Sequence, residues 1–243
     1  MFGGNIKMPK RILSLEDDKF KLINGNLENA VYKAQDEDLM LYSVSGIAGR
    51  LAEVIEEETR IDPKDQQRYE RMVNNWWNTP SYTGMGPVLL QNRAGDAKIL
   101  ISGEESFFPR KLWPGFANYN KENATFGFGE EKHFSMLWDN TTNFKGTVIY
   151  LPAESINVLN GKTQRSPRAK EILQKVLGNN YNSFRNALKE RTGSSNLELR
   201  LDVPENNKNT LALLSLKTNG ILGMSIENGQ YKQGGPIVTY SAN

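Results

Sequence analysis

The C-terminal part of the chain places the strongest limits on its fold. In Leu197–Val203, every second residue is apolar and the residues between are polar, a period typical of a strand with one face in water. Two more apolar runs follow, Leu211–Leu216 and Ile221–Ile226, with Asn-Gly at the end of the short segment that joins them. Asn-Gly favours a hairpin because a type I′ turn needs positive φ at both central residues. A second turn at Asn228-Gly229 leads to Pro236–Tyr240, so we predict an antiparallel β-meander.

Residues 46–78 have helical periodicity. Ile47, Leu51, Val54 and Ile55 recur at spacings of three and four, which places them on one face of a helix. Asp62-Pro63 is a typical helix start, with Asp as the N-cap and Pro in the first turn, and Thr79-Pro80 ends the second helix near residue 77. The segment therefore predicts a helical hairpin.

A second helical hairpin is predicted over residues 166–193. Ser166-Pro167 is a helix start, and Gly178 follows an apolar face as a C-terminal glycine does. After a short turn, a second helix is expected over Ser183–Arg191, ended by Gly193.

Strands are expected between and around these hairpins. Val88–Gln91 and Ala97–Ser102 predict a β-hairpin through Asn92–Gly95, Thr147–Leu151 predicts a strand, and Ser81–Pro87 is expected to be a loop. Alternating helical and strand segments of this kind favour an α+β fold of mainly antiparallel sheets, with two helical hairpins and the C-terminal β-meander. We expect a single domain over residues 1–243, with an N-terminal arm at 1–11 and a weak sub-boundary near 79–87.

Several familiar chemistries lack their residues in this sequence. The chain has no cysteine and one histidine, His133, which excludes thiolate sites and histidine pairs. Its glycines match neither a P-loop nor a dinucleotide fingerprint, and no G-x-S-x-G elbow occurs. No cofactor or metal is therefore expected. The nearest pattern to a metal-dependent nuclease is Asp96-Ala97-Lys98 followed by Glu104, because such enzymes hold a metal with converging carboxylates.

Residues 162–191 are rich in positive charge. Six of the basic residues are candidate contacts for nucleic acid or for a protein partner: Arg168, Lys170, Lys175, Arg185, Lys189 and Arg191. A basic helical pair can follow a phosphate backbone or enter a groove, whereas the alternative is an ordinary solvated hairpin. The net charge of the chain is only +2, which argues against a dedicated nucleic-acid binder.

An acidic segment balances the basic one. Residues 36–70 carry ten carboxylates and four basic side chains. Complementary patches on one chain pair either within the fold or between copies, and pairing between copies builds rings or tubes. An aromatic-rich stretch over residues 107–138 offers candidate interface residues, which are Trp113, Phe116 and Tyr119.

Three functional hypotheses follow. The first is a non-catalytic assembly protein that self-associates or binds other virion proteins, such as a connector, tail or minor capsid subunit of a virus or phage. The second is a nucleic-acid-binding protein that uses residues 166–191, and the third is a metal-dependent nuclease or a nucleotide-directed toxin. The sequence carries no recognisable signal peptide and no apolar run that would span a bilayer, so we expect a cytoplasmic or virion location and no membrane partner.

Overall fold

Helices and antiparallel strands occur along the same chain, which confirms the α+β class. The computed structural model describes residues 20–23, 39–41, 43–58, 66–78, 82–102, 134–135, 138–139, 146–201, 209–224, 226–227, 230–231 and 237–241. The expected arm at residues 1–11 lies outside this part of the chain.

Both predicted helical hairpins are present. The helices are α2 (Val44–Glu58), α3 (Gln66–Trp77), α6 (Ala153–Leu159), α7 (Pro167–Leu177), the 3-10 turn η2 (Gly178–Asn180) and α8 (Tyr181–Thr192). The first hairpin is α2–α3 and the second is α7–α8. α7 begins at the predicted Ser166-Pro167 start and stops at Gly178, and α8 stops at Gly193 in the left-handed conformation, with φ 76°.

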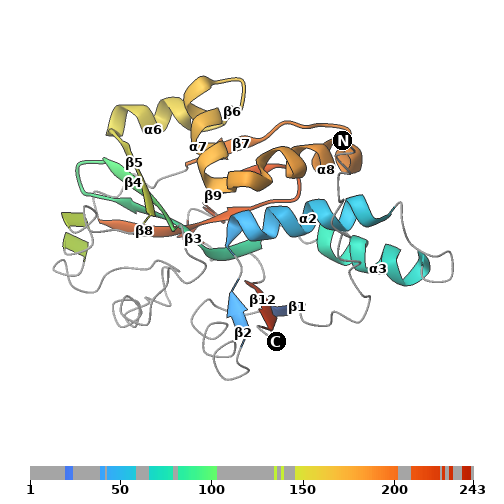
Figure 1. Cartoon of the computed structure of the whole chain (residues 1–243). Coiled ribbons are helices and arrows are strands. Elements are labelled where there is room, and N and C mark those ends of the chain that lie inside the picture. Colours follow the sequence, from blue (N-terminus) through green and yellow to red (C-terminus); the bar gives the residue numbers. More distant parts are fainter. Residues whose placement is uncertain are drawn as a thin grey trace, which may run out of the picture.

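The strands form a mainly antiparallel sheet beside the helices (Figure 1). They are β1 (Phe20–Ile23), β2 (Leu39–Leu41), β3 (Tyr82–Gln91), β4 (Ala97–Ser102), β5 (Gly146–Leu151), β6 (Lys162–Thr163), β7 (Glu198–Arg200), β8 (Thr210–Leu216), β9 (Ile221–Met224), β10 (Ile226–Glu227), β11 (Gln230–Tyr231) and β12 (Ile237–Ser241). The central part of the sheet runs β5-β4-β3-β8-β9-β7-β6. β12 pairs with β1, β2 and the beginning of β3, whereas β10 and β11 form a separate hairpin.

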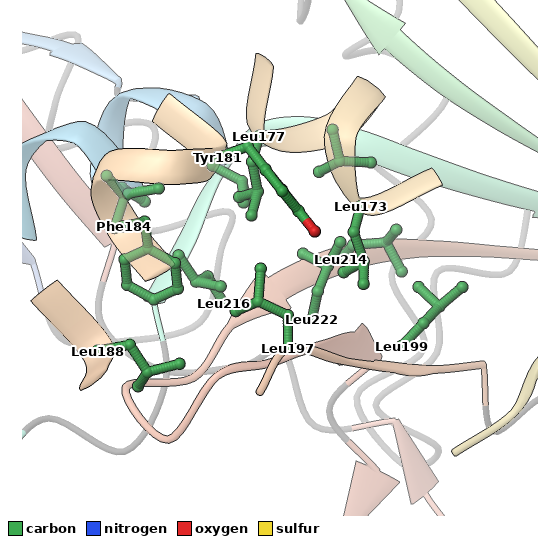
Figure 2. Packing of buried hydrophobic residues seen from close by; sticks show 14 of the residues in the cluster. Leu173, Leu177, Tyr181, Phe184, Leu188, Leu197, Leu199, Leu214, Leu216 and Leu222 are labelled. Carbon is green, nitrogen blue, oxygen red and sulfur yellow. The ribbon is translucent and has the colours of Figure 1, made fainter. Parts of the chain in front are cut away.

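Helices α2, α7 and α8 cover one face of this sheet (Figure 1). The core between them is built from alternate strand residues and the apolar stripes of the helices, among them Leu89, Ile99, Leu173, Phe184 and Leu222. Figure 2 shows the leucines of α7, β7, β8 and β9 converging in one cluster with Phe184. Burial of this many large apolar side chains supplies the main stabilising free energy of the fold.

The C-terminal strands β7, β8 and β9 form within the predicted segments, but their order differs from a simple meander. β8 and β9 make the expected hairpin, while β7 pairs in parallel with the far side of β9. The turn between β8 and β9 is also different from the predicted type I′ form. Lys217 pairs with Ile221, the N–H of Gly220 donates to the Lys217 carbonyl, and Gly220 has φ 87°, which is the three-residue loop with a glycine bulge.

Two other elements, β3 and α6, differ from what the sequence predicted. The prediction of a loop over Ser81–Pro87 was wrong, because β3 begins at Tyr82 and continues to Gln91. Its pairing with β8 shifts between Thr83 and Val88, and an irregularity of this kind lets a strand contain glycine and proline. Helix α6 was not predicted, since a seven-residue helix contributes little periodicity.

Candidate interaction surface

The basic residues of α7 surround one acidic residue. Arg168 Nη1 lies 2.6 Å and Lys175 Nζ 2.9 Å from the carboxylate oxygens of Glu171. The hydrogen bond from Lys175, followed in size by the one from Arg168, lowers the pKa of Glu171 below its ordinary value. Two of the six candidate contacts are therefore brought together, and Glu171 offsets part of their charge.

The basic residues of α8 point to other parts of the fold. Arg185 lies over the ring of Tyr181, with 5.5 Å from its guanidinium carbon to the ring centroid, and its Nε donates to the Ser195 carbonyl. Arg191 donates to the side-chain oxygen of Asn74 on α3.

Lys170 and Lys189 are exposed, and within the described residues neither side chain makes an ion pair or a hydrogen bond. Four of the six residues thus contact different neighbours, which are Glu171 for Arg168 and Lys175, the Ser195 carbonyl for Arg185, and α3 for Arg191.

The acidic helix α2 packs along the basic helix α8 inside the fold. Ser45 Oγ donates to the Leu177 carbonyl at 2.8 Å, and Asn180 Nδ2 donates to the Ser45 carbonyl at 2.9 Å. The contact uses the apolar faces of the two helices, while Glu53 stays 61% exposed on the outer side of α2. The two oppositely charged segments are thus neighbours within a single copy.

The carboxylate of Asp96 has a structural role. Its Oδ1 accepts a hydrogen bond from the backbone N–H of Ala153 at 3.1 Å, which caps the start of α6 from a different segment of the chain. The backbone N–H of Asp96 donates to Asn92 Oδ1 at 3.0 Å and closes the β3–β4 turn.

Lys98, the other part of the nuclease-like pattern, lies against an aromatic ring. Its Nζ donates to the Trp138 carbonyl at 2.7 Å and sits 4.4 Å from the centroid of the Trp138 ring. Glu104 and His133 lie outside the described residues. Among the residues that the structure describes, no group of three His, Cys, Asp or Glu side chains is arranged to hold a metal ion.

An open hollow of about 310 Å³ lies beside the β3–β4 turn. Phe134 and Trp138 stack at its wall with ring centroids 5.7 Å apart, and the polar lining comes from Asn92, Arg93, Ser135, Asp139 and Asn209. These groups offer stacking, hydrogen bonds and the carboxylate of Asp139. The predicted interface aromatics Trp113, Phe116 and Tyr119 lie outside the described residues.

The edge of the sheet at β5 carries features that the sequence patterns did not single out. Tyr150 on β5 is 49% exposed and Val158 on α6 is 65% exposed. Among the strands that the structure describes, β5 pairs only with β4, and none of them lies on its other side, which is here called the open edge. The signal in the sequence is the run Gly-Thr-Val-Ile-Tyr-Leu, which has high strand propensity and no charge.

Tyr150 interacts with charged side chains near this edge, which are Asp96 and Arg168. Partial desolvation raises the pKa of Tyr150 above its ordinary value, and the nearby Asp96 carboxylate raises it further. Arg168 Nη2 donates to the Tyr150 carbonyl at 3.3 Å, so a side chain from α7 touches the backbone of the edge strand. Within the described residues, the β5 edge thus combines an exposed aromatic ring with backbone groups that no strand pairs.

No helix within the described part of the chain has the length and apolar character needed to cross a membrane. Comparison of the sequence with family models and with curated proteins, and of the fold with solved structures, finds no match.

Proposed function

We propose that this chain is a non-catalytic assembly protein that self-associates, most concretely a virus or phage virion component such as a connector, tail or minor capsid subunit. The observation that carries the proposal is the outer edge of β5, which no other strand of the described residues covers and which carries the exposed ring of Tyr150. Unpaired strand edges pair with other chains, and natural monomers usually protect them with charge, proline or a bulge. An unprotected edge favours a protein that functions in contact with another chain.

The polar groups considered for the other two hypotheses support this proposal indirectly. Asp96 caps a helix, Lys98 lies on Trp138, and Arg168 and Lys175 share Glu171. Side chains with structural partners are less available for metal binding or for a phosphate backbone.

The proposal is tested by light scattering during size-exclusion chromatography over a wide range of protein concentrations, with absorbance at 260 and 280 nm recorded together. We expect a defined oligomer free of nucleic acid, with a mass that is a multiple of 27.4 kDa. A monomer at the highest concentration contradicts the proposal. A monomer that carries nucleic acid supports the hypothesis of binding through residues 166–191. A monomer with metal-dependent nuclease activity that is lost in Asp96→Ala supports the hypothesis of an enzyme.

A further inference from the structure

The two ends of the central sheet are protected to different degrees. At one end, β6 has two residues, and a strand this short offers little edge for pairing. At the other end, β5 has six residues and contains no charged residue and no proline. It lies with α6 at the end of the sheet remote from α3 (Figure 1). Among the described residues, the one charged group on the backbone of this edge is Arg168, which reaches the Tyr150 carbonyl from α7.

The side of β5 that faces away from β4 carries backbone N–H and C=O groups with which an antiparallel strand can pair. In an antiparallel ladder, alternate residues direct N–H and C=O toward one neighbour, and the residues between direct them to the other side. β5 uses its inner groups on β4, with Leu151 opposite Ala97 and Gly146 opposite Ser102. Half of its backbone groups consequently face the open edge.

We propose that β5 of a second copy of this chain pairs antiparallel with β5 across a two-fold axis at Val148, so that the two sheets become one. The inference rests on the proposed function, because it names the partner and the surface of that self-association. A two-fold contact needs a self-complementary surface, since each residue meets its own symmetry mate or a fixed counterpart.

The exposure of β5 side chains favours this register. With Val148 opposite itself, Gly146 of one copy lies opposite Tyr150 of the other, and Thr147 lies opposite Ile149. Gly146, Thr147 and Tyr150 are exposed in the single chain, whereas Val148 is half-buried and Ile149 is buried. Pairing would therefore cover the exposed glycine with the exposed aromatic ring, a cross-strand combination that stabilises edge glycines.

Arg168 supplies a second argument for a strand as the occupant of this edge. Its Nη2 donates to the Tyr150 carbonyl at 3.3 Å, a place where an N–H of a neighbouring strand can donate instead. Arg168 is also held by Glu171, so it keeps a partner when the carbonyl is taken over.

Single cysteines test the register directly, because the natural chain has none. Residues that face each other across antiparallel strands have Cα atoms about 4.5–5.5 Å apart, within the range of about 4.4–6.8 Å that a disulfide spans. Val148→Cys is therefore expected to form a covalent dimer under mild oxidation. In the proposed dimer of Tyr150→Cys, the two thiols are four residues apart along the strand direction, or about 13 Å. This distance is too long for a disulfide.

The matched control is Gln174→Cys, an exposed position on α7. Each variant is compared with the natural chain by circular dichroism and thermal unfolding, and cross-linking is followed by non-reducing electrophoresis. Should Val148→Cys fold poorly, the double variant Gly146→Cys with Tyr150→Cys replaces it, since both positions are exposed and face each other in the proposed dimer.

We expect most of Val148→Cys in the covalent dimer and at least tenfold less dimer in the two single-cysteine controls. Failure of Val148→Cys and of the double variant to cross-link, in a protein that light scattering shows to be an oligomer, overturns the β5 interface and leaves the proposed function standing. Equal or faster cross-linking of Tyr150→Cys overturns the register. A natural chain that is monomeric at every concentration overturns both proposals.

Discussion

The side-chain amide of Asn180 occupies the space that a Cβ atom on Gly49 would need, since such an atom would lie 2.8 Å from Asn180 Nδ2. Asn180 sits between α7 and α8 and donates to the backbone of Ser45, near the start of α2. Gly49 therefore allows α2 to approach the second helical hairpin closely enough for this contact.

Gly49→Ala is expected to lower the free energy of unfolding by about 1 kcal/mol. Alanine in a helix interior normally adds about 0.5–1 kcal/mol. Here the methyl group displaces Asn180, whose hydrogen bonds to the carbonyl and hydroxyl of Ser45 are worth about 0.5–1.5 kcal/mol each. Chemical denaturation measures the change. In an Asn180→Ala background the same substitution should stabilise, and a loss of similar size in both backgrounds would contradict the contact.

Tyr181→Phe is expected to raise the free energy of unfolding by about 1 kcal/mol. The Tyr181 side chain is 3% exposed, and among the described residues its hydroxyl has no hydrogen-bond partner. Figure 2 shows this hydroxyl among leucine side chains, close to Leu173 and Leu214. Burial of an unsatisfied hydroxyl costs free energy that phenylalanine avoids. Tyr150→Phe, at an exposed site, is the control and should change little; a destabilised Tyr181→Phe would contradict this account.

Gly220→Ala is expected to be much more damaging than Gly161→Ala. Both glycines have positive φ, 87° and 72°, so alanine pays a backbone cost of about 1–2 kcal/mol at each. A Cβ on Gly161 meets nothing within 4 Å, whereas one on Gly220 would lie 2.5 Å from the Asn196 carbonyl oxygen and 2.6 Å from Leu188 Cδ2. Thermal unfolding of the two variants measures the difference, which should exceed about 1 kcal/mol. Equal losses of stability in the two variants would contradict the prediction and would show that the β8–β9 turn shifts to accommodate the added methyl group.

Tyr150 is expected to ionise above its ordinary pKa of 10.0, and Asp96→Asn should lower that pKa without fully restoring it. Desolvation is the largest single cause and remains in the variant, as does the repulsion by Glu154, whereas the repulsion by the Asp96 carboxylate is removed. Because the folded-state pKa is raised, the stability linked to this phenol is present below its unfolded pKa and is lost as pH rises through the folded pKa. Absorbance at 295 nm during a pH titration, minus that of Tyr150→Phe, isolates this group. An unchanged pKa in Asp96→Asn would contradict the contact.

Local sequence signals predicted those elements that begin and end at residues of their own segment. Ser166-Pro167 and Gly178 bound α7, and Asn92–Gly95 forms the turn between β3 and β4 as expected. Helix α6 differs because its first N–H groups are capped partly by Asp96, a residue of another segment. No local pattern encodes such a cap.

Strand neighbours were harder to predict than strands. The alternation in residues 197–203 predicts β7 but does not say which side of β9 it will join. The bend in β3 depends on pairing with β8, since a glycine- and proline-containing stretch becomes a strand only when a neighbour holds it.

For the candidate surface, charge alone identified the basic residues, but their orientation depends on tertiary partners. Glu171 shares a helix with Arg168 and Lys175, so its ion pairs follow from helical spacing. Ser195 and Asn74, the partners of Arg185 and Arg191, come from other segments. The exposure of Tyr150 likewise follows from the position of β5 at the end of the sheet, which a single sequence does not specify.

The contact between α2 and α8 has a consequence for synthesis of the chain. Ser45 and Asn180 are 135 residues apart, and at about 5–20 residues per second a ribosome needs about 7–27 s to make the chain between them. During that time the apolar face of α2, with Ile47 and Leu51, has emerged without the helix that covers it. Chaperone binding to the nascent chain is therefore expected to begin soon after α2 leaves the ribosome and to end when α8 follows.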